Sequence, residues 1–346
     1  MSLVINARFL TQPMTGVQRF SREVVTALAA TTPLRLLAPQ GAPDHFAGLP
    51  VEIIGTRGGQ GWEQLDLPGA LRGGMLVNLG NTAPLRGAAR QALVIHDAGV
   101  FDTPESYSLA FRSWYRALHL ALPRLGTRLI TVSGFSRRRL AENLRLDGSR
   151  IGVMPEGGEH VLREPADATI LAKHGLAPRR YALAVGTRAA HKNLDALREA
   201  VALLASRGLT LAVAGAADAS VFRNVGDVDS ARALGRVSDA ELRALYENAL
   251  CLVFPSRYEG FGLPPIEAMW CGCPVLAADA GAVPEVCGDA ALWFDAAGPR
   301  TPAAALARLL DEPGLAAHLA EAGRIRAKRY SWPAAAARLL ELVGSR

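Results

Sequence analysis

Short apolar runs alternate with amphipathic helical runs along the chain, and this alternation constrains the fold more than any other feature. The runs in the first half that are typical of buried strands are Leu3–Asn6, Leu34–Ala38, Val51–Ile54, Met75–Asn78, Ala92–Ile95 and Arg128–Val132. Between the first two, apolar residues recur at the spacing of one helix face, namely Val17, Phe20, Val24 and Leu28. Strands that are separated by helices pair in parallel through right-handed crossovers. We therefore predict an α/β domain whose ligands bind at the carboxyl ends of the strands.

The second half repeats this alternation, which indicates a second domain of the same class. Its predicted strands are Tyr181–Val185, Leu209–Ala214, Ala231–Leu234, Leu250–Phe254, Pro274–Ala277 and Ala291–Phe294. A chain of 346 residues is long enough for two domains of ordinary size. We place them at residues 1–165 and 166–325, followed by a C-terminal segment, 326–346, with a helix at about Trp332–Val343. Two doubly wound sheets with a cleft between them are the expected architecture.

Composition and charge exclude several classes of protein. Half of the residues are hydrophobic and 20% are charged, which suits filled cores rather than disorder. No apolar run approaches the roughly 18–20 residues of a membrane span, and the N-terminus lacks a signal-peptide layout, so we expect a cytoplasmic protein. The net charge is +6, but no dense Lys/Arg run is interleaved with aromatics, so nucleic acid is not an expected partner. An anionic substrate, or peripheral contact with the anionic inner face of a membrane, accounts for the same excess.

The four cysteines, Cys251, Cys271, Cys273 and Cys287, all lie in the second half. Cys271 and Cys273 have neither the partner pair nor the histidines of a zinc site, and a reducing compartment disfavours disulfides. We expect all four to be buried as small apolar side chains. The sequence predicts no metal site and no cofactor.

The stretch Phe254–Cys273 reads F-P-S-R-Y-E-G-F-G-L-P-P-I-E-A-M-W-C-G-C and carries the strongest functional signal. A buried strand gives way to a Gly/Pro loop, and a helix begins near Pro264 or Pro265, because proline suits the first helical position. The loop delivers backbone amides to the positive end of the helix, which makes a site for an anion such as phosphate. Glu259 precedes the loop and Glu267 is predicted in the first helical turn, where the alternative role is a simple cap of the helix dipole.

This string, from Pro-Ser through Glu-Gly-Phe-Gly-Leu-Pro and Glu-Ala to Gly-Cys-Pro-Val, resembles the nucleotide-binding signature of the retaining glycosyltransferases of family 4. The resemblance covers nearly the whole chain and is strongest from Val185 to Asp289. It implies the GT-B fold, in which two doubly wound, Rossmann-like domains face a cleft and a C-terminal helix crosses back to the first domain. It also implies that residues 1–165 form the acceptor-side domain and that residues 166–325 bind the nucleotide sugar. Within the family, the chain is similar to bacterial mannosyltransferases of polysaccharide biosynthesis.

A basic pair follows the predicted strand at Tyr181 in the string G-T-R-A-A-H-K-N. Arg188 and Lys192 are four residues apart, and such a pair can grip a diphosphate and stabilise its charge as it leaves. The alternative is a solvated helix face. The resemblance implies the first role, without a metal ion, and implies that the neighbouring donor-binding residues are Gly186, Thr187 and Asn193.

The resemblance also implies roles for the other residues of the donor site. Glu259 holds hydroxyls of the donor sugar and stabilises developing positive charge, while Glu267 accepts hydrogen bonds from the ribose. Val237 and Ser238 lie beside the base. The residues that form the loop and the helix N-terminus are Gly260, Phe261, Gly262 and Leu263.

Three loops of the first half also meet the condition for a ligand site. One of them, residues 133–137, resembles the family's V-S-x-F-S segment, which supports the fold more than any chemistry. Gly16 lets the backbone come close to a ligand at a helix start, although a glycine that merely starts a helix is the competing interpretation. The resemblance places this loop near the donor diphosphate and the acceptor and implies that Gly16 is a donor-binding residue.

His96 and Asp97 directly follow a predicted strand. Three roles are open to such a pair: a general base, a metal ligand, or a hydrogen-bonded pair in the core. By resemblance, His96 lines the pocket for the transferred sugar and is a catalytic residue, and Asp97 orients its ring.

The string Trp62-Glu63-Gln64, with Leu67-Pro68 behind it, resembles a subgroup that acts on exported polysaccharides, often with mannose donors. An aromatic ring suits the face of a sugar, and it equally suits the edge of a core. Both roles remain open for Trp62 at this point.

The function that the resemblance implies is a metal-independent hexosyltransferase that retains anomeric configuration. We expect it to move mannose from GDP-mannose to a glycan or a polyprenyl-diphosphate-linked acceptor at the cytoplasmic membrane face. A UDP-sugar donor is one alternative, and a nucleotide-sugar epimerase is another. A non-catalytic nucleotide-sugar-binding protein is a third, against which the intact set of basic and acidic residues argues.

Overall fold

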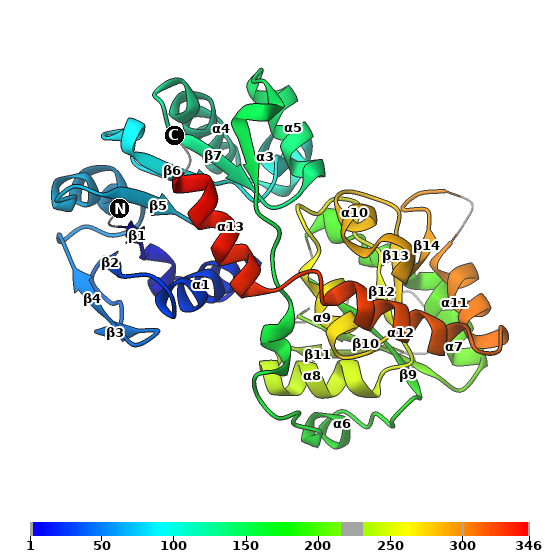
Figure 1. Ribbon diagram of the computed structural model, residues 1–346. Helices are drawn as coiled ribbons and strands as arrows, with labels where there is room; N and C mark the ends of the chain where they lie inside the picture. Colours follow the sequence, from blue (N-terminus) through cyan, green and yellow to red (C-terminus); the bar gives the residue numbers. More distant parts are fainter. Residues whose placement is uncertain (1–2, 188, 216–230, 299–300, 345–346) are drawn as a thin grey trace. The chain divides into compact units, whose positions relative to one another are not determined.

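The computed structural model describes residues 3–187, 189–215, 231–298 and 301–344 (Figure 1). Contacts divide the chain into two compact units: unit 1 comprises Met1–Glu156 with Trp332–Arg346, and unit 2 comprises Gly157–Ser331. The expected boundary was residue 165, but His160 contacts Glu267 within unit 2, so the segment after Glu156 packs with the second unit. No helix among the described residues is both long and apolar enough to cross a membrane.

Unit 1 is built on an eight-stranded sheet in the order β3-β4-β2-β1-β5-β6-β7-β8. The strands are β1 (Leu3–Asn6), β2 (Leu34–Ala38), β3 (His45–Phe46), β4 (Leu49–Ile53), β5 (Met75–Asn78), β6 (Gln91–Val94), β7 (Arg128–Thr131) and β8 (Ile151–Val153). Every pairing is parallel except that of β3 with β4. The sequence did not predict β3, because a two-residue strand is too short to show a periodic pattern.

Helices and helical turns connect these strands and cover the sheet. They are η1 (Arg8–Thr11), α1 (Gly16–Ala29), α2 (Gly59–Gly61), η2 (Trp62–Asp66), η3 (Leu67–Ala70), η4 (Ala88–Arg90), α3 (Gly99–Asp102), η5 (Pro104–Ser106), α4 (Leu109–Arg124), α5 (Gly134–Leu144) and η6 (Gly148–Arg150). Strands β1, β5 and β6 consist entirely of buried residues, as expected of parallel strands covered on both faces.

The C-terminal helix α13 (Trp332–Gly344) packs on unit 1, as predicted, and lies beside α1 in Figure 1. The ring of Trp332 is buried and meets the edge of Phe20 with ring centres 5.9 Å apart. At the other end, the Arg128 guanidinium donates hydrogen bonds to the carbonyls of Leu342 at 3.4 Å and Val343 at 2.8 Å. Arg128 thereby satisfies carbonyls that the last turn of a helix leaves without a partner.

Unit 2 is built on a six-stranded parallel sheet in the order β11-β10-β9-β12-β13-β14. The strands are β9 (Tyr181–Val185), β10 (Thr210–Ala214), β11 (Ala231–Gly235), β12 (Leu252–Phe254), β13 (Val275–Ala278) and β14 (Ala291–Phe294). The helical elements are η7 (Glu159–Leu162), α6 (Thr169–Lys173), η8 (Ala190–Lys192), η9 (Leu194–Leu197), α7 (Arg198–Ser206), α8 (Asp239–Asn248), α9 (Leu263–Trp270), α10 (Val283–Cys287), η12 (Gly288–Ala290), α11 (Pro302–Asp311) and α12 (Leu315–Ala327). The structure confirms the predicted α/β class and a largely parallel sheet in each unit.

Candidate active site

The strand order of unit 2 reverses between β9 and β12. Strand β9 pairs with β10 on one side and with β12 on the other, and the chain leads away from the two central strands in opposite directions. Loops at the carboxyl ends of such a strand pair diverge and leave a crevice, where open α/β sheets bind ligands. The two loops here are the predicted donor-binding segments: one follows Val185 and the other follows Phe254.

The loop after β9 brings Lys192 back over the sheet edge. The methylene carbons of Lys192 lie over Gly186, where an added Cβ would be 3.7 Å from Lys192 Cδ. Asn193 adopts a left-handed conformation with a φ of 54°, and its buried amide donates to the carbonyls of Pro255 at 3.1 Å and Ala296 at 3.2 Å. Asn193 therefore ties this loop to the loop after β12. The predicted residue Arg188 lies outside the described residues.

Lys192 and Glu259 meet at the crevice. Lys192 Nζ is 2.7 Å from Glu259 Oε1, and 20% and 13% of the two side chains are exposed. The ammonium also lies 5.9 Å from the ring centre of Phe254. Each member of this pair is thus partly open to solvent. An ammonium in that position can transfer its hydrogen bond from the carboxylate to an anionic ligand.

Helix α9 begins at Leu263, directly after Gly262, whose φ of 104° favours glycine. The next two residues, Pro264 and Pro265, carry no N–H. Among the amides that a helix start leaves without an acceptor inside the helix, only those of Gly262 and Leu263 therefore remain as donors. The neighbouring predicted residue Phe261 is buried, and its ring meets the edge of Tyr330 at 5.4 Å, so this side chain packs in unit 2.

The backbone of Glu259 is held by a turn that sequence reasoning missed. The amide of Ala282 donates to the Glu259 carbonyl at 3.1 Å. Gly281 has a φ of 64°, and a Cβ there would lie 2.7 Å from the Glu259 nitrogen. Only glycine fits this close approach of two backbones. Gly281 is therefore a positioning residue for Glu259, and no spacing rule links the two positions.

Glu267 lies in the second turn of α9, which corrects its predicted place in the first turn. The helix starts earlier than expected, at Leu263, and its first turn contains no acidic residue. Glu267 is buried, and Oε2 accepts a hydrogen bond from the Tyr246 hydroxyl at 3.0 Å. Oε1 lies 3.1 Å from Nε2 of His160. A capping role at the helix terminus is thereby ruled out, because the carboxylate belongs to a buried polar cluster.

Tyr246 and His160 were not expected from the sequence. Burial, followed by the charge of Glu267, raises the pKa of Tyr246 well above its ordinary value, so its hydroxyl remains a donor. His160 lies in η7, in the segment that follows the division between the units. No motif marks either residue, since each becomes a partner of Glu267 only through folding.

Ser238, predicted beside the base, is the N-cap of α8. Its hydroxyl accepts from the Glu241 amide at 3.2 Å, and the Glu241 carboxylate accepts from the Ser238 amide at 2.7 Å. This reciprocal capping box satisfies two amides of the helix start. The positions of Val237 and Ser238 beside a base, and of Thr187 in the donor site, remain predictions.

In unit 1, His96 is buried at the start of the loop that follows β6. Its Nε2 lies 3.0 Å from the Leu79 carbonyl, and its Nδ1 lies 3.3 Å from Glu156 Oε1. Burial by itself lowers the pKa of His96, but the hydrogen bond and charge of Glu156 outweigh it, so the pKa lies above its ordinary value. Both ring nitrogens therefore face acceptors, an arrangement that favours the protonated imidazole.

The carboxylate that contacts the His96 ring is Glu156 rather than the predicted Asp97. Asp97 Oδ1 instead accepts from the Gly99 amide at 2.7 Å and shapes the turn into α3. Gly16 occupies the first position of α1, and no side chain caps this helix start among the described residues. This position fits both interpretations of Gly16, a close approach of the backbone to a ligand and a simple helix start.

Trp62 belongs to the core. Its side chain is fully buried, and its indole nitrogen donates to the Ile54 carbonyl at 2.8 Å. It packs with Val4, Leu37, Leu67 and Leu76. Of the two roles left open by the sequence, the structure thus selects the structural one.

The cysteines are not paired with one another. Cys251, Cys273 and Cys287 are buried as predicted, whereas Cys271 is half-buried. Burial raises the pKa of Cys251 and of Cys287 to about 12, so both thiols are inert at neutral pH. In the part of the chain that the structure describes, no group of three or more His, Cys, Asp or Glu side chains is arranged to hold a metal ion.

Comparison with known proteins identifies relatives of the chain. The family model described as glycosyl transferases group 1 matches residues 167–326. O-antigen chain mannosyltransferase B of Escherichia coli is 32% identical over 256 residues, which are 70% of this chain and 67% of that protein. MMP alpha-(1->4)-mannosyltransferase of Mycolicibacterium hassiacum is 31% identical over 238 residues, 65% of this chain and 56% of that protein. The chain thus spans roughly half to two thirds of these relatives.

Solved structures of known proteins match the whole chain. Anabaena Alr3699/HepE, crystallised in complex with UDP and glucose, superposes with a TM-score of 0.77. The match covers 100% of each chain at 17% sequence identity. A sequence identity at that level supports a conclusion about the fold alone. The fold is GT-B.

Proposed function

We propose, on the premise that this chain belongs to the group 1 glycosyl transferases, that it is a retaining mannosyltransferase that uses GDP-mannose. The observation that carries the proposal is the contact of Lys192 with Glu259 at the switch point of unit 2, beside the Gly262 and Leu263 amides. A cation and two amides suit a diphosphate, and a carboxylate suits sugar hydroxyls. The named donor-binding and catalytic residues remain part of this proposal.

The proposed reaction proceeds without a metal ion. The bond between the anomeric carbon and the diphosphate oxygen breaks, and an acceptor hydroxyl forms the new bond on the same face of the sugar. The hydroxyl proton passes to the departing phosphate oxygen, so GDP is the second product. Lys192, Arg188 and the amides of Gly262 and Leu263 stabilise the charge that develops on the diphosphate. Glu259 holds donor-sugar hydroxyls and stabilises the positive charge on the sugar ring.

Same-face attack is favoured over a double displacement. A double displacement needs a carboxylate nucleophile and a second carboxylate as acid and base at the anomeric carbon. Glu267 is engaged with Tyr246 and His160, and we assign it to the ribose hydroxyls. Glu259 is then the one carboxylate that this proposal assigns to the sugar, and a double displacement needs two. His96 is proposed to contact the transferred sugar after its ring gives up one of its acceptors.

Mannose is the proposed sugar because both relatives described above are named mannosyltransferases. The proposed acceptor is a glycan or a polyprenyl-diphosphate-linked oligosaccharide, reached in the cytoplasm by peripheral contact with the membrane. The net charge of +6 suits both the anionic donor and an anionic membrane face.

Thermal unfolding with GDP, UDP, ADP and their sugars tests the donor. A ligand that binds only the folded state, present at about 100 times its dissociation constant, adds about 2.7 kcal/mol to the free energy of unfolding. We expect a rise in melting temperature with GDP and GDP-mannose. A rise in melting temperature with UDP alone would indicate a UDP-sugar donor and leave the glycosyltransferase class unchanged. No rise with any nucleotide would refute the proposal that the protein uses a nucleotide sugar.

Glu267→Gln provides the matched variant for this panel. The amide keeps the volume of the side chain but accepts weaker hydrogen bonds than the carboxylate does. We expect GDP affinity in calorimetry to fall about fivefold, because hydrogen bonds to charged groups exceed those to neutral groups by roughly 1 kcal/mol. Unchanged GDP affinity would remove the ribose role from Glu267.

A further inference from the structure

Two buried histidines of unit 1 hold the same loop, which follows β5. Nε2 of His96 lies 3.0 Å from the Leu79 carbonyl, and Nε2 of His119 lies 2.8 Å from the Asn81 carbonyl. Each Nε2 therefore carries a proton, because a carbonyl oxygen can only accept a hydrogen bond. The two residues are 6% and 2% exposed, so burial disfavours a charge on either ring.

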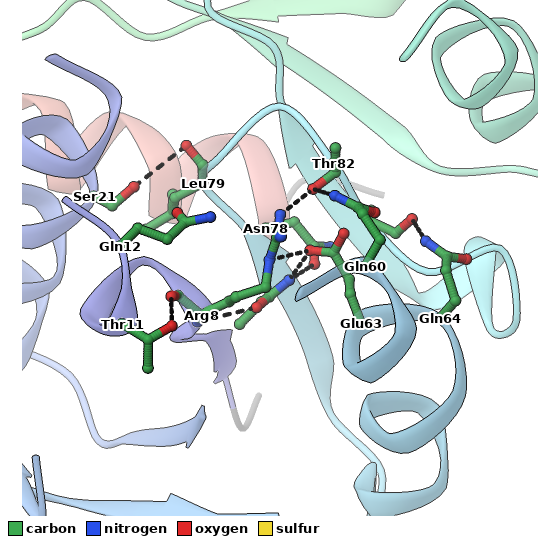
Figure 2. A network of polar contacts seen from close by, with 12 residues as sticks. Arg8, Thr11, Gln12, Ser21, Gln60, Glu63, Gln64, Asn78, Leu79 and Thr82 are labelled. Atoms are coloured by element: carbon green, nitrogen blue, oxygen red, sulfur yellow. Dashed lines mark hydrogen bonds and ion pairs between the residues drawn. The ribbon is translucent and has the colours of Figure 1, made fainter. Parts of the chain in front are cut away.

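The loop is itself tied to other elements, so the carbonyls that it offers are fixed in place. The Leu79 carbonyl also accepts from the Ser21 hydroxyl of α1 at 3.4 Å. The Thr82 hydroxyl accepts from Arg8 at 2.8 Å, and Figure 2 shows both contacts. The acceptor for Nε2 of His96 is thus preorganised, and the ring cannot turn over without losing it.

The two rings differ at Nδ1. Nδ1 of His96 lies 3.3 Å from Oε1 of Glu156, whereas the buried Nδ1 of His119 has no hydrogen-bond partner among the described residues. Burial lowers the pKa of His119 to about 4, so this ring is neutral near pH 7. Burial acts on His96 in the same direction, but the hydrogen bond and the charge of Glu156 outweigh it and hold the pKa above its ordinary value. Glu156 thus distinguishes a charged histidine from a neutral one.

Glu156 dominates the charges that act on the His96 ring. Asp97 acts in the same direction more weakly, and its Oδ1 accepts from the Gly99 amide at 2.7 Å. The Phe20 ring packs perpendicular to the imidazole with ring centres 4.5 Å apart and contributes no charge. Removal of the Glu156 charge should therefore leave burial as the main influence on this ring.

The charge state decides what His96 can do in a reaction. An imidazolium donates from both nitrogens and has no lone pair with which to accept a proton, so it cannot serve as a general base. Its Nδ1–H makes the longer of the two contacts and is the donor that a sugar hydroxyl can share. The carboxylate of Glu156 balances the charge, so the pair does not oppose the positive charge that develops on a sugar ring.

We propose that Glu156 is a positioning residue that keeps His96 in the imidazolium form. His96 then donates a hydrogen bond to a hydroxyl of the transferred sugar and does not act as a general base. This inference rests on the proposed function, which assigns His96 to that sugar. It agrees with the proposed route of the acceptor proton, which passes to the departing phosphate oxygen.

Proton–nitrogen NMR of the full chain with isotopically labelled histidines tests the charge state without any turnover. The two ring nitrogens of an imidazolium resonate close together, whereas those of a neutral ring differ widely. At about pH 6.5, the ordinary pKa of histidine, we expect the imidazolium pattern for His96 and the neutral pattern for His119. The loss of one signal in each of His96→Asn and His119→Gln assigns them. A neutral His96 in the wild type overturns the proposal.

Glu156→Gln keeps the shape of the side chain and removes its charge. At about pH 7.5, one unit above the ordinary pKa of about 6.5, burial should then leave at most roughly a tenth of the His96 rings charged. We expect kcat to fall roughly fivefold to tenfold at that pH, and the difference from the wild type to narrow towards about pH 5.5. Asp97→Asn is the matched control, because it removes a carboxylate beside the same histidine and still accepts from the Gly99 amide. It should keep the pH profile of the wild type.

A general base would respond in the opposite way, because it needs the neutral ring. Equal or higher kcat in Glu156→Gln at about pH 7.5 therefore overturns the proposal. A loss of equal size at every pH does so too, since it would show a purely structural role. A charged His96 in a protein that transfers no sugar would reject the proposed function and its sugar contact, but not the charge that Glu156 maintains. A neutral His96 in an active glycosyltransferase would reject this inference alone.

Discussion

Replacing Lys192 with alanine should lower turnover about 100-fold or more, while the protein remains folded. The loss of one preorganised group that stabilises transition-state charge typically costs this much. Lys192 Nζ is already held at the crevice by Glu259 at 2.7 Å, so no large reorganisation precedes its contact with a diphosphate. The effect should fall on kcat, because the charge of the leaving group is greatest in the transition state.

The matched control is Lys173→Ala, which removes an exposed ammonium of the same unit. Lys173 ends α6 and lies 3.9 Å from Glu241, so its contribution is that of a solvated surface pair. This variant should keep the turnover of the wild type. Steady-state release of GDP from GDP-mannose measures both variants. Similar turnover in Lys192→Ala and Lys173→Ala would remove Lys192 from the catalytic residues.

Gly281→Ala should lower both stability and turnover. The φ of 64° costs a residue with a Cβ roughly 1–2 kcal/mol, and the added carbon would lie 2.7 Å from the Glu259 nitrogen. The contacted atoms belong to the Glu259 backbone, so they cannot make room for the added carbon unless Glu259 itself moves. Because a displacement of about 1 Å in a catalytic group costs on the order of 100-fold in rate, we expect turnover to fall by that factor.

Gly314→Ala separates the cost of the left-handed backbone conformation from the effect of the close contact with Glu259. Gly314 has a φ of 84°, but an added Cβ meets nothing within 4 Å. It should therefore share the loss of unfolding free energy and keep full turnover. Chemical denaturation and turnover are measured on both variants. Equal turnover in the two would show that Gly281 does not position Glu259.

The strands and their parallel pairing were predictable because the sheets are buried on both faces. Each central strand is a continuous apolar run, and a run of this kind between helical patterns admits few topologies. The same reasoning located the loops at Lys192 and Glu259, because they follow strands. Proline placed the start of α9 near its true position, and the error of one or two residues moved Glu267 into the wrong turn.

Contacts between distant segments were not predictable. His96 was paired with its sequence neighbour Asp97, but the chain brings Glu156 to the ring from 60 positions away. His160 and Tyr246 reach Glu267 from two further elements. The burial of Trp62 could not be predicted from the residue type, because it depends on which face of the sheet η2 covers. Periodicity defines an element and one of its faces, and only the packed fold defines the neighbours of that face.

The most direct test of the central claim follows GDP-mannose, an α-linked donor, by NMR in the presence of α-mannobiose and the full chain. Phosphorus spectra report the release of GDP, and proton spectra report the anomeric configuration of the new linkage. The account predicts release of GDP together with a new α-linked mannose. A β-linked product would contradict retention, and the absence of transfer from GDP-mannose and from every other nucleotide sugar would contradict the proposed function as a whole.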